Sequence, residues 1–546
     1  MTDAQRPAMD SLGRLRLHGA TLDRVVISAL VVLAAVMRIP NLVTRGTWEA
    51  DQGHDMLTLR SMVQDGVLPL LGPPTSIGDV HHGAWYYYLL SPAAAVTGGD
   101  SPLAVVALIG LAGIAAVAAV WWLAHQMGGP VAAAVAGLVT ALSAAAIDES
   151  TFIWNPNLIA LSSALALGGA WRAWQGGDRR WWLLAALGTA VTMQCHILGV
   201  VLLPIVAVPF LADTRRRGVG MVHVGVLAIF ALAYLPLVIN ELTTDGSELQ
   251  AALQYLAGGR PAGETAVPIR FGIVGLRVLS WPLTGLITDG FGAAGLASAA
   301  VVAIAIWRSR AGGADQLAAR WLGLGLLWST AFLTIAAPSL ASVVPGLPND
   351  HYHAFADPMV FTLLGLGVAA LVRGGVGPAV APGGRIGVAA AAVGLVALIG
   401  WNATHLPPAV HPDGGVPAGE RATARVEAAL ADAGVGADRI LRIQSLPTFK
   451  SSEAIAYPLV RAGRLVVADT AKGIAPGSTA QDGAPGALIL LCDDRFRDAL
   501  GAACGGPAEA TVTPDPGGPV WGPLLDRFEA APDRYVSVYG AASAPS

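Results

Sequence analysis

Three carboxylates stand close together in the first polar stretch of the chain, at Glu49, Asp51 and Asp55. They follow directly on the first long apolar segment, and acids at such a depth usually line a polar cavity because charge near hydrocarbon is costly. A carboxylate within hydrogen-bond reach of a hydroxyl group can accept its proton and act as a general base. A solvated acidic turn is the alternative interpretation of the same residues.

Histidines and aromatic residues continue this stretch at His54, His81, His82, Trp85 and Tyr87. Imidazole together with carboxylate suits zinc or manganese, so the histidines are candidates for a divalent metal; hydrogen bonding within a polar cavity is the alternative. The aromatic side chains are candidates for stacking on a sugar or lining an acceptor path. Trp and Tyr also gather at membrane interfaces, so simple anchoring is their alternative role.

Later polar positions offer further candidates. Asn155 and His196 stand at the ends of apolar segments and are candidates for the site. The alternative role of Asn155 is to cap a helix, and the alternative for His196 is a buried, hydrogen-bonded histidine. Guanidinium groups match phosphate oxygens bidentately, so Arg270 and Arg277 are candidates for an anionic group, with Arg260 as the fallback. Arginines near a helix end also simply extend toward the membrane surface, which is the alternative for all three.

The elements that must position these residues are membrane helices. The 546 residues are 54% hydrophobic and only 13% charged, with a mean hydropathy of +0.58, whereas a soluble domain carries about a quarter charged residues. Apolar runs long enough to cross the bilayer predict an all-α polytopic membrane protein with about eleven to thirteen helices. The runs lie near 22–40, 103–124, 130–147, 157–174, 180–194, 196–212, 219–240, 286–307, 318–337, 354–373 and 385–403, with ambiguous segments at 84–98 and 271–285.

Arginine clusters predict the orientation. By the positive-inside bias, the loops that carry them are cytoplasmic, and so is the tail 1–21. The polar loops between them, led by the first loop 41–102, are then outside. Within 180–212, Gln194 and His196 predict a break between two helices at the outer surface. The arginine clusters are Arg14, Arg16 and Arg24; Arg172, Arg179 and Arg180; Arg215, Arg216 and Arg217; Arg308, Arg310 and Arg320; and Arg373 with Arg385.

The character of the chain changes after the transmembrane domain 22–403. Residues 404–546 are rich in Pro and Gly, with an amphipathic helix pattern at 420–433 and strand-like runs at 439–444 and 487–491. This pattern predicts a small extracytoplasmic α/β domain. Cys492 and Cys504 both lie in it and could form a disulfide in an oxidising compartment, although their spacing alone does not prove one.

An ordered set of short motifs in 20–375 resembles a known family. The set begins with Asp51-Gln52-Gly53-His54-Asp55, Gly72-Pro73-Pro74 and the segment 82–92, and it continues with Trp154-Asn155-Pro156-Asn157, Gln194-Cys195-His196 and His351-Tyr352 before Pro358. It is similar to bacterial family 39-type glycosyltransferases. These belong to the C-type superfamily and are related to protein O-mannosyltransferases and to the lipid A aminoarabinose transferase.

The resemblance implies an inverting transfer of a hexose or pentose from a polyprenyl-phosphate donor, in the bacterial plasma membrane. The acceptor would be a hydroxyl of a protein, a glycolipid or a cell-wall glycan, and the partners would be donor, acceptor and membrane lipids. Asp51 matches the family's catalytic aspartate. The other candidates, for substrate binding, are Glu49, Gln52, His54, Asp55, His81, His82, Trp85, Tyr87, Asn155, His196, Arg270, Arg277, His351 and Tyr352, with His353 assisting at the phosphate.

One position departs from the family. Many relatives have Glu where this chain has Gln52, which leaves a single-aspartate mechanism intact but makes a two-carboxylate or metal-bridging version doubtful. Glu49 or Asp55 is then the candidate replacement for the second acid.

Other function classes fit less well. A net charge of −4 gives no reason to expect nucleic acid, and the chain has no Gly-rich nucleotide loop and no zinc-type Cys/His spacing. A lipid or sugar transporter would need ionisable residues deep within its membrane spans. The predicted spans contain almost none, and Asp289 is the main exception. A non-catalytic scaffold is the second alternative, and it predicts that Asp51, Asp55 and His82 do not converge on one cavity.

Overall fold

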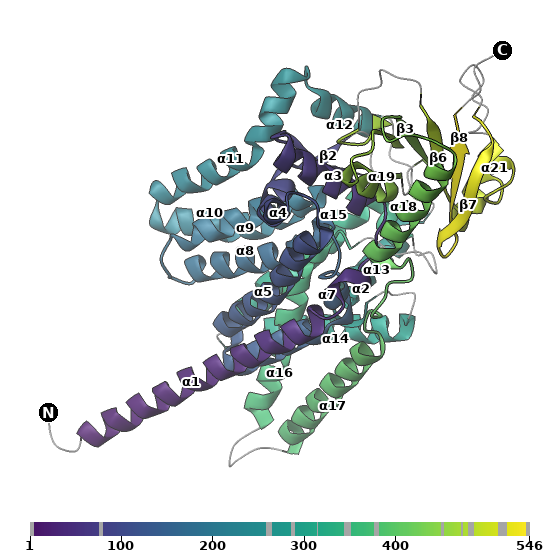
Figure 1. The fold of residues 1–546 in the computed structure, drawn as a ribbon. Helices are drawn as coiled ribbons and strands as arrows, with labels where there is room; N and C mark the ends of the chain where they lie inside the picture. Colours follow the sequence, from purple (N-terminus) through teal and green to yellow (C-terminus); the bar gives the residue numbers. More distant parts are fainter. Residues whose placement is uncertain are drawn as a thin grey trace.

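The structure is a computed structural model that describes most of the chain. Its helical part runs from one end, where α1 projects, to the other end, where a β-sheet domain packs (Figure 1). The Arg260 and Asp289 positions lie outside the described residues. The described residues are 5–75, 80–257, 265–285, 290–313, 315–342, 351–375, 382–448, 452–470, 473–478, 485–510 and 521–541.

Seven helical segments of the described chain are long and apolar enough to cross a membrane. The chain is therefore a multi-pass membrane protein. Glycines with positive φ end two of these helices, Gly129 after α5 and Gly218 after α10, as expected for a residue without a Cβ. The seven are α5 (Pro102–Gly128), α10 (Leu202–Arg217) with the 3-10 turn before it, α11 (Met221–Thr243), α14 (Phe291–Arg310), α15 (Gln316–Ala336), α16 (Asp357–Gly375) and α17 (Pro382–Thr404).

Each apolar run predicted as a span overlaps a helix of the described chain, but the run 130–147 is split at Ser143 into a helix of thirteen residues and a short helix, Ala144–Asp148. The remaining helices that overlap such runs are α1 (Gln5–Arg38), α6 (Pro130–Leu142), α8 (Ile159–Trp174) and α9 (Trp181–Cys195). The predicted break is confirmed, because α9 ends at Cys195 and the 3-10 turn η2 (Ile197–Val201) follows His196. Of the two ambiguous segments, α4 (Trp85–Val96) has twelve residues and is too short to cross, and α13 has eighteen (Val267–Thr284).

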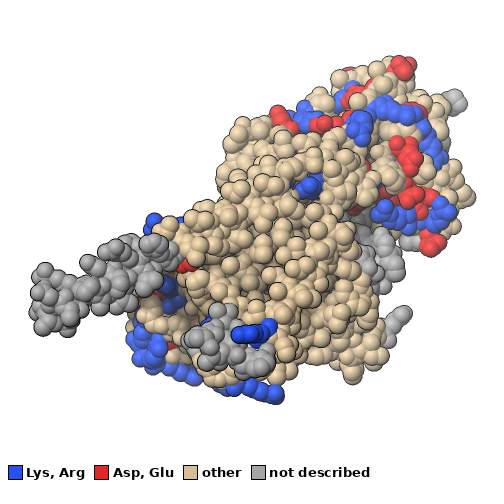
Figure 2. Space-filling view, turned by 90° about the horizontal axis from the view of Figure 1, so that it is seen from below, with Lys and Arg blue, Asp and Glu red and all other residues tan. Residues whose placement is uncertain are grey.

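The arginine-bearing loops meet at one end of the helices. Arg179 donates to the Gly218 carbonyl at 2.7 Å, and the Arg308 and Arg373 guanidinium groups share the Asp315 carboxylate at 2.7 and 2.8 Å. Figure 2 shows a broad face almost free of charged side chains between a basic edge and the mixed-charge surface of the C-terminal domain. This distribution is that of a helical bundle whose apolar band faces lipid.

The predicted outer loops meet at the other end and carry short elements of their own. A two-stranded antiparallel ribbon joins the Gly72-Pro73-Pro74 turn to the His81–Gly83 segment. These elements are α2 (Leu42–Arg45), α3 (Ala50–Gln64), β1 (Leu71–Pro74), β2 (His81–Gly83), α7 (Ala144–Asp148), η1 (Asn155–Leu158), α12 (Ser247–Ala257), η3 (Pro338–Ala341) and η4 (Ala354–Ala356).

The C-terminal region forms a six-stranded mixed sheet in the order β5-β4-β3-β6-β8-β7. The three strands β4, β3 and β6 are parallel, and the fully buried β6 lies between β3 and the antiparallel hairpin β7–β8. This confirms the predicted α/β character. The elements are α18 (Gly415–Asp432), β3 (Leu441–Leu446), α19 (Ser452–Arg461), β4 (Val466–Thr470), β5 (Gly473–Ile474), β6 (Ala487–Asp493), η5 (Asp494–Phe496), α20 (Arg497–Leu500), α21 (Pro507–Ala510), β7 (Leu524–Ala531) and β8 (Arg534–Gly540).

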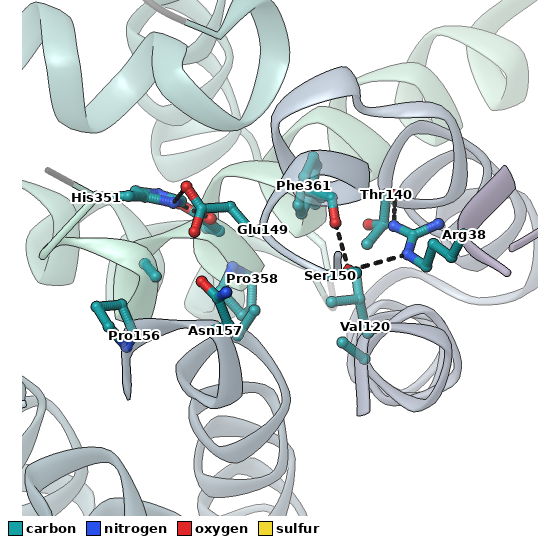
Figure 3. Close-up of a pocket in the computed structure, with 16 residues that line it drawn as sticks. Arg38, Val120, Thr140, Glu149, Ser150, Pro156, Asn157, His351, Pro358 and Phe361 are labelled. Atoms are coloured by element: carbon teal, nitrogen blue, oxygen red, sulfur yellow. Dashed lines mark hydrogen bonds and ion pairs between the residues drawn. The ribbon is translucent and has the colours of Figure 1, made fainter. Parts of the chain in front are cut away.

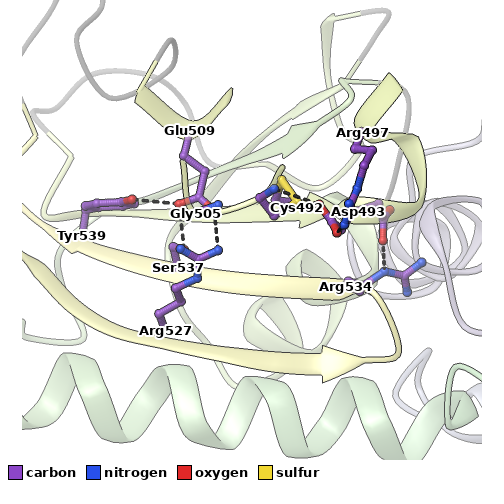
Figure 4. Close-up of a disulfide and its surroundings, with 11 residues drawn as sticks. Cys492, Asp493, Arg497, Gly505, Glu509, Arg527, Arg534, Ser537 and Tyr539 are labelled. Atoms are coloured by element: carbon purple, nitrogen blue, oxygen red, sulfur yellow. Dashed lines mark hydrogen bonds and ion pairs between the residues drawn. A yellow bond between two sulfur atoms is a disulfide. The ribbon is translucent and has the colours of Figure 1, made fainter. Parts of the chain in front are cut away.

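Cys492 and Cys504 form the disulfide that the sequence left open, with their Cα atoms 5.7 Å apart. It ties the end of β6 to the segment before α21 (Figure 4). Beside it, the buried Glu509 carboxylate accepts hydrogen bonds from Ser537 and Tyr539, at 3.1 and 3.0 Å. These contacts fasten α21 onto the sheet.

The C-terminal domain rests directly on the first loop. The indole Nε1 of Trp48 donates to the Ala454 carbonyl at 2.9 Å, and the Tyr457 hydroxyl donates to the Gly99 carbonyl at 3.0 Å. Both partners in the domain belong to α19, which packs along α3. The segment that carries the first-loop acids is therefore covered on one side by the C-terminal domain.

Two polar contacts reinforce this docking. The Asp413 carboxylate accepts the Trp48 backbone N–H at 2.9 Å. The buried Arg534 guanidinium bridges Asp493 of the domain and Glu49 of the first loop, at 2.8 and 3.0 Å. Both contacts lie at the residues that lead into α3.

Candidate functional site

Asp51 is exposed in the first turn of α3, and its neighbours hold that turn in place. Glu49 is the N-cap, and Gln52 accepts the Glu49 backbone N–H through Oε1 at 2.9 Å. Through Nε2, Gln52 also donates to the Ile153 carbonyl at 2.8 Å. Because an ionised glutamate has no hydrogen to donate, only the amide can make both bonds. The departure from the family pattern at Gln52 therefore has a structural reason.

Asp55, one helical turn further, is buried under α4. Its carboxylate accepts hydrogen bonds from the hydroxyl groups of Tyr86 and Tyr87, at 2.6 and 2.9 Å. Burial raises the pKa of Asp55 to about 7, although the charge of His54 and the tyrosine hydroxyls act in the opposite direction. Asp55 and Tyr87 thus fasten α3 to α4, and neither side chain is open to solvent.

Two first-loop histidines face separate carboxylates. His54 lies 3.6 Å from Glu453 of α19, and the pKa of His54 is raised because Glu453, Asp55 and Asp51 together outweigh the lowering effect of burial. His81 binds Glu248 of α12 through both its ring Nδ1 and its backbone N–H, each at 2.8 Å. The predicted metal role of these histidines with the first-loop acids stays a prediction.

Four rings connect the first loop to the later loops, and we call them the ring column: His82, His196, Tyr352 and Trp154. Their successive centroid separations are 4.5, 4.4 and 6.0 Å. His82 accepts the Ile197 backbone N–H at 3.2 Å. Four motifs that are far apart in sequence therefore meet here.

Asn155 and Trp85 support the ring column from two sides. The Asn155 amide donates to the Cys195 carbonyl at 2.5 Å, so it fixes the backbone just before His196. The Trp85 backbone N–H donates to the Gln194 side chain at 3.3 Å. Both contacts hold the end of α9 against neighbouring loops.

A second set of polar side chains lies at the start of α16, and we call it the late-loop group: Glu149, His351, His353 and Asp357. His351 sits between two carboxylates, with Nδ1 at 3.3 Å from Glu149 and Nε2 at 3.2 Å from Asp357. Burial alone would lower the pKa of His351, but the two carboxylates raise it to about 9. Burial, with the charges of His351 and Arg277, lowers the pKa of His353 well below its usual range.

His351, His353 and Asp357 could hold a metal. One nitrogen or oxygen atom of each lies within 4.8 Å of the others, and all three residues are buried. Among the described residues, no other set of at least three His, Cys, Asp or Glu side chains meets this criterion. No sequence spacing pointed to this arrangement.

A pocket opens beside the late-loop group, and Glu149, His351 and Asp357 line it. Figure 3 shows Glu149 and His351 on one side of it and Arg38 with Ser150 on the other. Arg38 is buried and donates to the Thr140 and Ala141 carbonyls at 3.0 Å each, so its charge holds helix ends together. Asp51, Asp55 and His82 do not line this pocket.

The two candidate phosphate arginines lie on the same helix, α13. Arg277 is buried beside Trp281, 5.9 Å from its ring centroid, and Trp281 stacks on His351 at 4.9 Å. Arg270 lies about 10 Å further along the helix axis. It donates to the Thr265 and Thr334 carbonyls, at 3.1 and 3.3 Å. Arg277 is therefore the arginine that the fold brings to the late-loop group.

The sequence analysis did not predict four acids of this region as site residues: Glu149, Glu248, Asp357 and Glu453. Glu149 and Asp357 each adjoin an apolar run, which is a signal that the sequence does contain. Glu453 has no such signal, because its contact with His54 depends on how the C-terminal domain docks.

No protein-family model and no curated protein matches the sequence significantly. Among solved structures, the chain aligns with the oligosaccharyltransferase of Archaeoglobus fulgidus in complex with Zn and sulfate. The identity is 14%, the TM-score is 0.50, and the alignment covers 88% of this chain and 70% of that one. At this identity the likeness establishes the fold alone, and it confirms the C-type glycosyltransferase fold that the motifs predict.

Two other structures align with TM-scores below 0.5. The first is apo ArnT from Cupriavidus metallidurans, at 14% identity and a TM-score of 0.49, covering 95% of this chain and 98% of that one. The second is arabinofuranosyltransferase AftD from mycobacteria, at 14% identity and a TM-score of 0.43, covering 96% of this chain and 40% of that one. The fold assignment does not rest on either.

Proposed function

We propose that this chain transfers a sugar from a polyprenyl-phosphate donor to a hydroxyl of a protein, glycolipid or cell-wall glycan. The observation that carries the proposal is the position of Asp51. Of the three first-loop acids, Asp55 is buried against two tyrosines and Glu49 is bound to Arg534, whereas Asp51 is exposed in the first turn of α3. The motif resemblance and the fold support the same assignment.

In the proposed reaction, the Asp51 carboxylate accepts the proton of the acceptor hydroxyl as its oxygen attacks the anomeric carbon. The bond from that carbon to the phosphate oxygen breaks, the polyprenyl phosphate leaves, and the configuration inverts. The leaving oxygen gains negative charge, which a nearby cation stabilises. We assign this role to Arg277, because guanidinium is the side chain best matched to phosphate oxygens.

The proposed orientation follows from charge. The arginine-rich end of the bundle would face the cytoplasm, together with the amino-terminal tail 1–21, in a bacterial plasma membrane. The transmembrane domain 22–403 would then carry the site at its outer end, beneath an extracytoplasmic domain formed by 404–546. The lipid-linked donor would enter from the bilayer, and the acceptor from the aqueous side.

The proposal assigns no step of the transfer to a metal. Of the first-loop histidines, His54 and His81 face Glu453 and Glu248, which come from different elements, and His82 stacks in the ring column. A single carboxylate base suffices for the inverting displacement.

The test is transfer of radiolabelled sugar from polyprenyl-phosphate donors in membranes that contain matched amounts of each variant. Wild type is expected to transfer label, and Asp51→Asn to lose at least about 100-fold of the rate, since general-base catalysis contributes about 10²–10⁴-fold. Asp65→Asn is the matched control, because Asp65 is an exposed acid at the other end of α3 and is expected to keep full activity.

Donor binding separates catalysis from recognition. Asp51→Asn is expected to bind the donor as tightly as wild type does. Equal transfer rates in wild type and Asp51→Asn would remove Asp51 as the base. Absence of transfer with every donor sugar tried would favour the transporter or scaffold alternative.

A further inference from the structure

His353 is fully buried, and neither of its ring nitrogens has a hydrogen-bond partner within the described structure. Each nitrogen of an imidazole ring carries either a hydrogen that it can donate or a lone pair that can accept. Burying such a group without a hydrogen-bond partner costs free energy. Trp281 covers the ring edge-on at 5.6 Å, and His351 lies at 4.7 Å. The surroundings of His353 therefore call for a ligand at one of its nitrogens.

We infer that His351, His353 and Asp357 bind a zinc ion. Their three ligand atoms lie within 4.8 Å of one another. Zinc ligands lie about 2.0–2.1 Å from the metal in a tetrahedral arrangement, which places them about 3.4 Å apart. Small side-chain rotations therefore suffice to close the group around an ion. Two imidazoles and one carboxylate are a ligand set typical of zinc, and they leave a fourth position open.

Glu149 lies beside the three proposed ligands as a candidate hydrogen-bond partner for His351. The two nitrogens of His351 point in different directions, Nε2 toward Asp357 and Nδ1 toward Glu149 at 3.3 Å. A zinc-ligating histidine usually donates its other ring N–H to a carboxylate, which fixes the tautomer and the ring plane. Nδ1 lies 3.3 Å from Glu149 but makes no hydrogen bond within the described structure, so with Nε2 on the metal a small side-chain movement would bring Glu149 to the Nδ1–H group.

The local charges permit the ion. Glu149 and Asp357 supply two negative charges beside the site, and Arg277 supplies one positive charge beside Trp281. The competing occupant is a proton on His351 shared by the two carboxylates. A proton there satisfies His351 but leaves His353 without a partner, and this difference favours the metal.

The ion would stiffen the loop that reaches the ring column. Tyr352 stands between the two histidines in sequence and stacks on His196 at 4.4 Å. Ligands on both sides of Tyr352 would fix the backbone that carries it. Zinc binding is tested separately from the proposed transfer reaction, because it can be measured without donor or acceptor.

The experiment uses the full chain, purified in detergent, stripped with a chelator and reloaded with Zn²⁺ alone. Mass spectrometry of the metal content is expected to give about one zinc per wild-type chain. His353→Ala and Asp357→Asn are expected to lose it, and Glu149→Ala to weaken the zinc affinity about 10- to 100-fold. His125→Ala is the matched control: His125 also pairs with a carboxylate, Asp23 at 3.2 Å, but at the opposite end of the bundle.

His353→Cys separates loss of a ligand from misfolding. A thiolate is also a zinc ligand, so this variant is expected to retain the metal. Co²⁺ in place of Zn²⁺ should give the visible absorption of a tetrahedral site in wild type and not in His353→Ala. A wild-type chain that takes up no zinc, or a folded His353→Ala chain that takes up as much as wild type, would overturn the inference. A wild-type chain that takes up zinc but transfers no sugar would count against the proposed function and not against the zinc site.

Discussion

Side chains of similar chemistry in the first loop have very different surroundings. Asp51 and Asp55 are one helical turn apart, yet the first is exposed and the second is buried beneath two tyrosine hydroxyls. Gln52 lies between them and is committed to the helix cap and to the Ile153 carbonyl. Asp51 can therefore reach a substrate, whereas Gln52 and Asp55 stabilise the structure of the loop.

The titration of Asp55 is a prediction at this scale. Because burial raises its pKa to about 7 in the folded chain, the folded state binds this proton more tightly than the unfolded state does. The resulting stabilisation is complete below about pH 4 and is lost as the pH rises through about 7, with an upper limit of about 4 kcal/mol. The melting temperature of wild type is therefore expected to fall as the pH rises from about 4 to about 7.

Asp55→Asn removes this titration, so its melting temperature should depend less on pH over the same range. Asp65→Asn, which changes an exposed acid on the same helix, should keep the wild-type slope. The difference between the two slopes isolates Asp55 from His54, which also titrates nearby. An unchanged slope in Asp55→Asn would show that Asp55 is ionised throughout.

At the scale of elements, the contact between α3 and α19 couples the two halves of the chain. α3 carries the exposed Asp51, and α19 of the C-terminal domain packs along α3. Gly53 makes the approach possible, because a Cβ added there would lie 2.2 Å from the Glu453 carbonyl oxygen. The two helices touch along their backbones at this point.

Gly53→Ala is therefore expected to force α19 away from α3. Overpacking of this kind typically costs about 1–3 kcal/mol, and the displaced backbone leaves little room for relaxation. The expected readouts are a lower melting temperature and faster proteolysis between the membrane helices and the C-terminal sheet. Gly292→Ala in α14 is the control, since a Cβ there meets nothing within 4 Å. Equal proteolysis of the two variants would contradict the close packing.

At the scale of the whole molecule, charge separates into two ends. Arginines collect at one end of the apolar band, and the loops that carry the candidate site collect at the other, under the C-terminal domain. The disulfide between Cys492 and Cys504 lies in that domain, which suits an oxidising compartment.

Cysteine labelling in intact cells tests this orientation. In a Cys195→Ser background, Asp65→Cys should react with a membrane-impermeant maleimide, because Asp65 is exposed at the proposed outer end. Arg180→Cys, at an arginine whose side chain is 87% exposed, should react only after the membrane is opened. The reverse pattern would place the candidate site in the cytoplasm.

The sequence alone predicts the local features of this protein well. The break at His196, the helix and strands predicted for the C-terminal region and all the apolar runs except 130–147, which is split at Ser143, match observed elements, because local composition and periodicity govern them. The ordered motifs also predict the fold class. The number of membrane crossings and the domain boundaries stay predictions.

Contacts between distant segments come only from the tertiary structure. Packing brings Glu453 to His54, Glu248 to His81, and His353 to Asp357. Among the described residues, neither ring nitrogen of His353 has a hydrogen-bond partner. Such contacts depend on how helices and domains approach one another, and single-residue spacing carries no record of that approach. Whether a polar side chain of this chain is exposed, paired or buried is therefore settled by packing, although its chemical type is evident from the sequence.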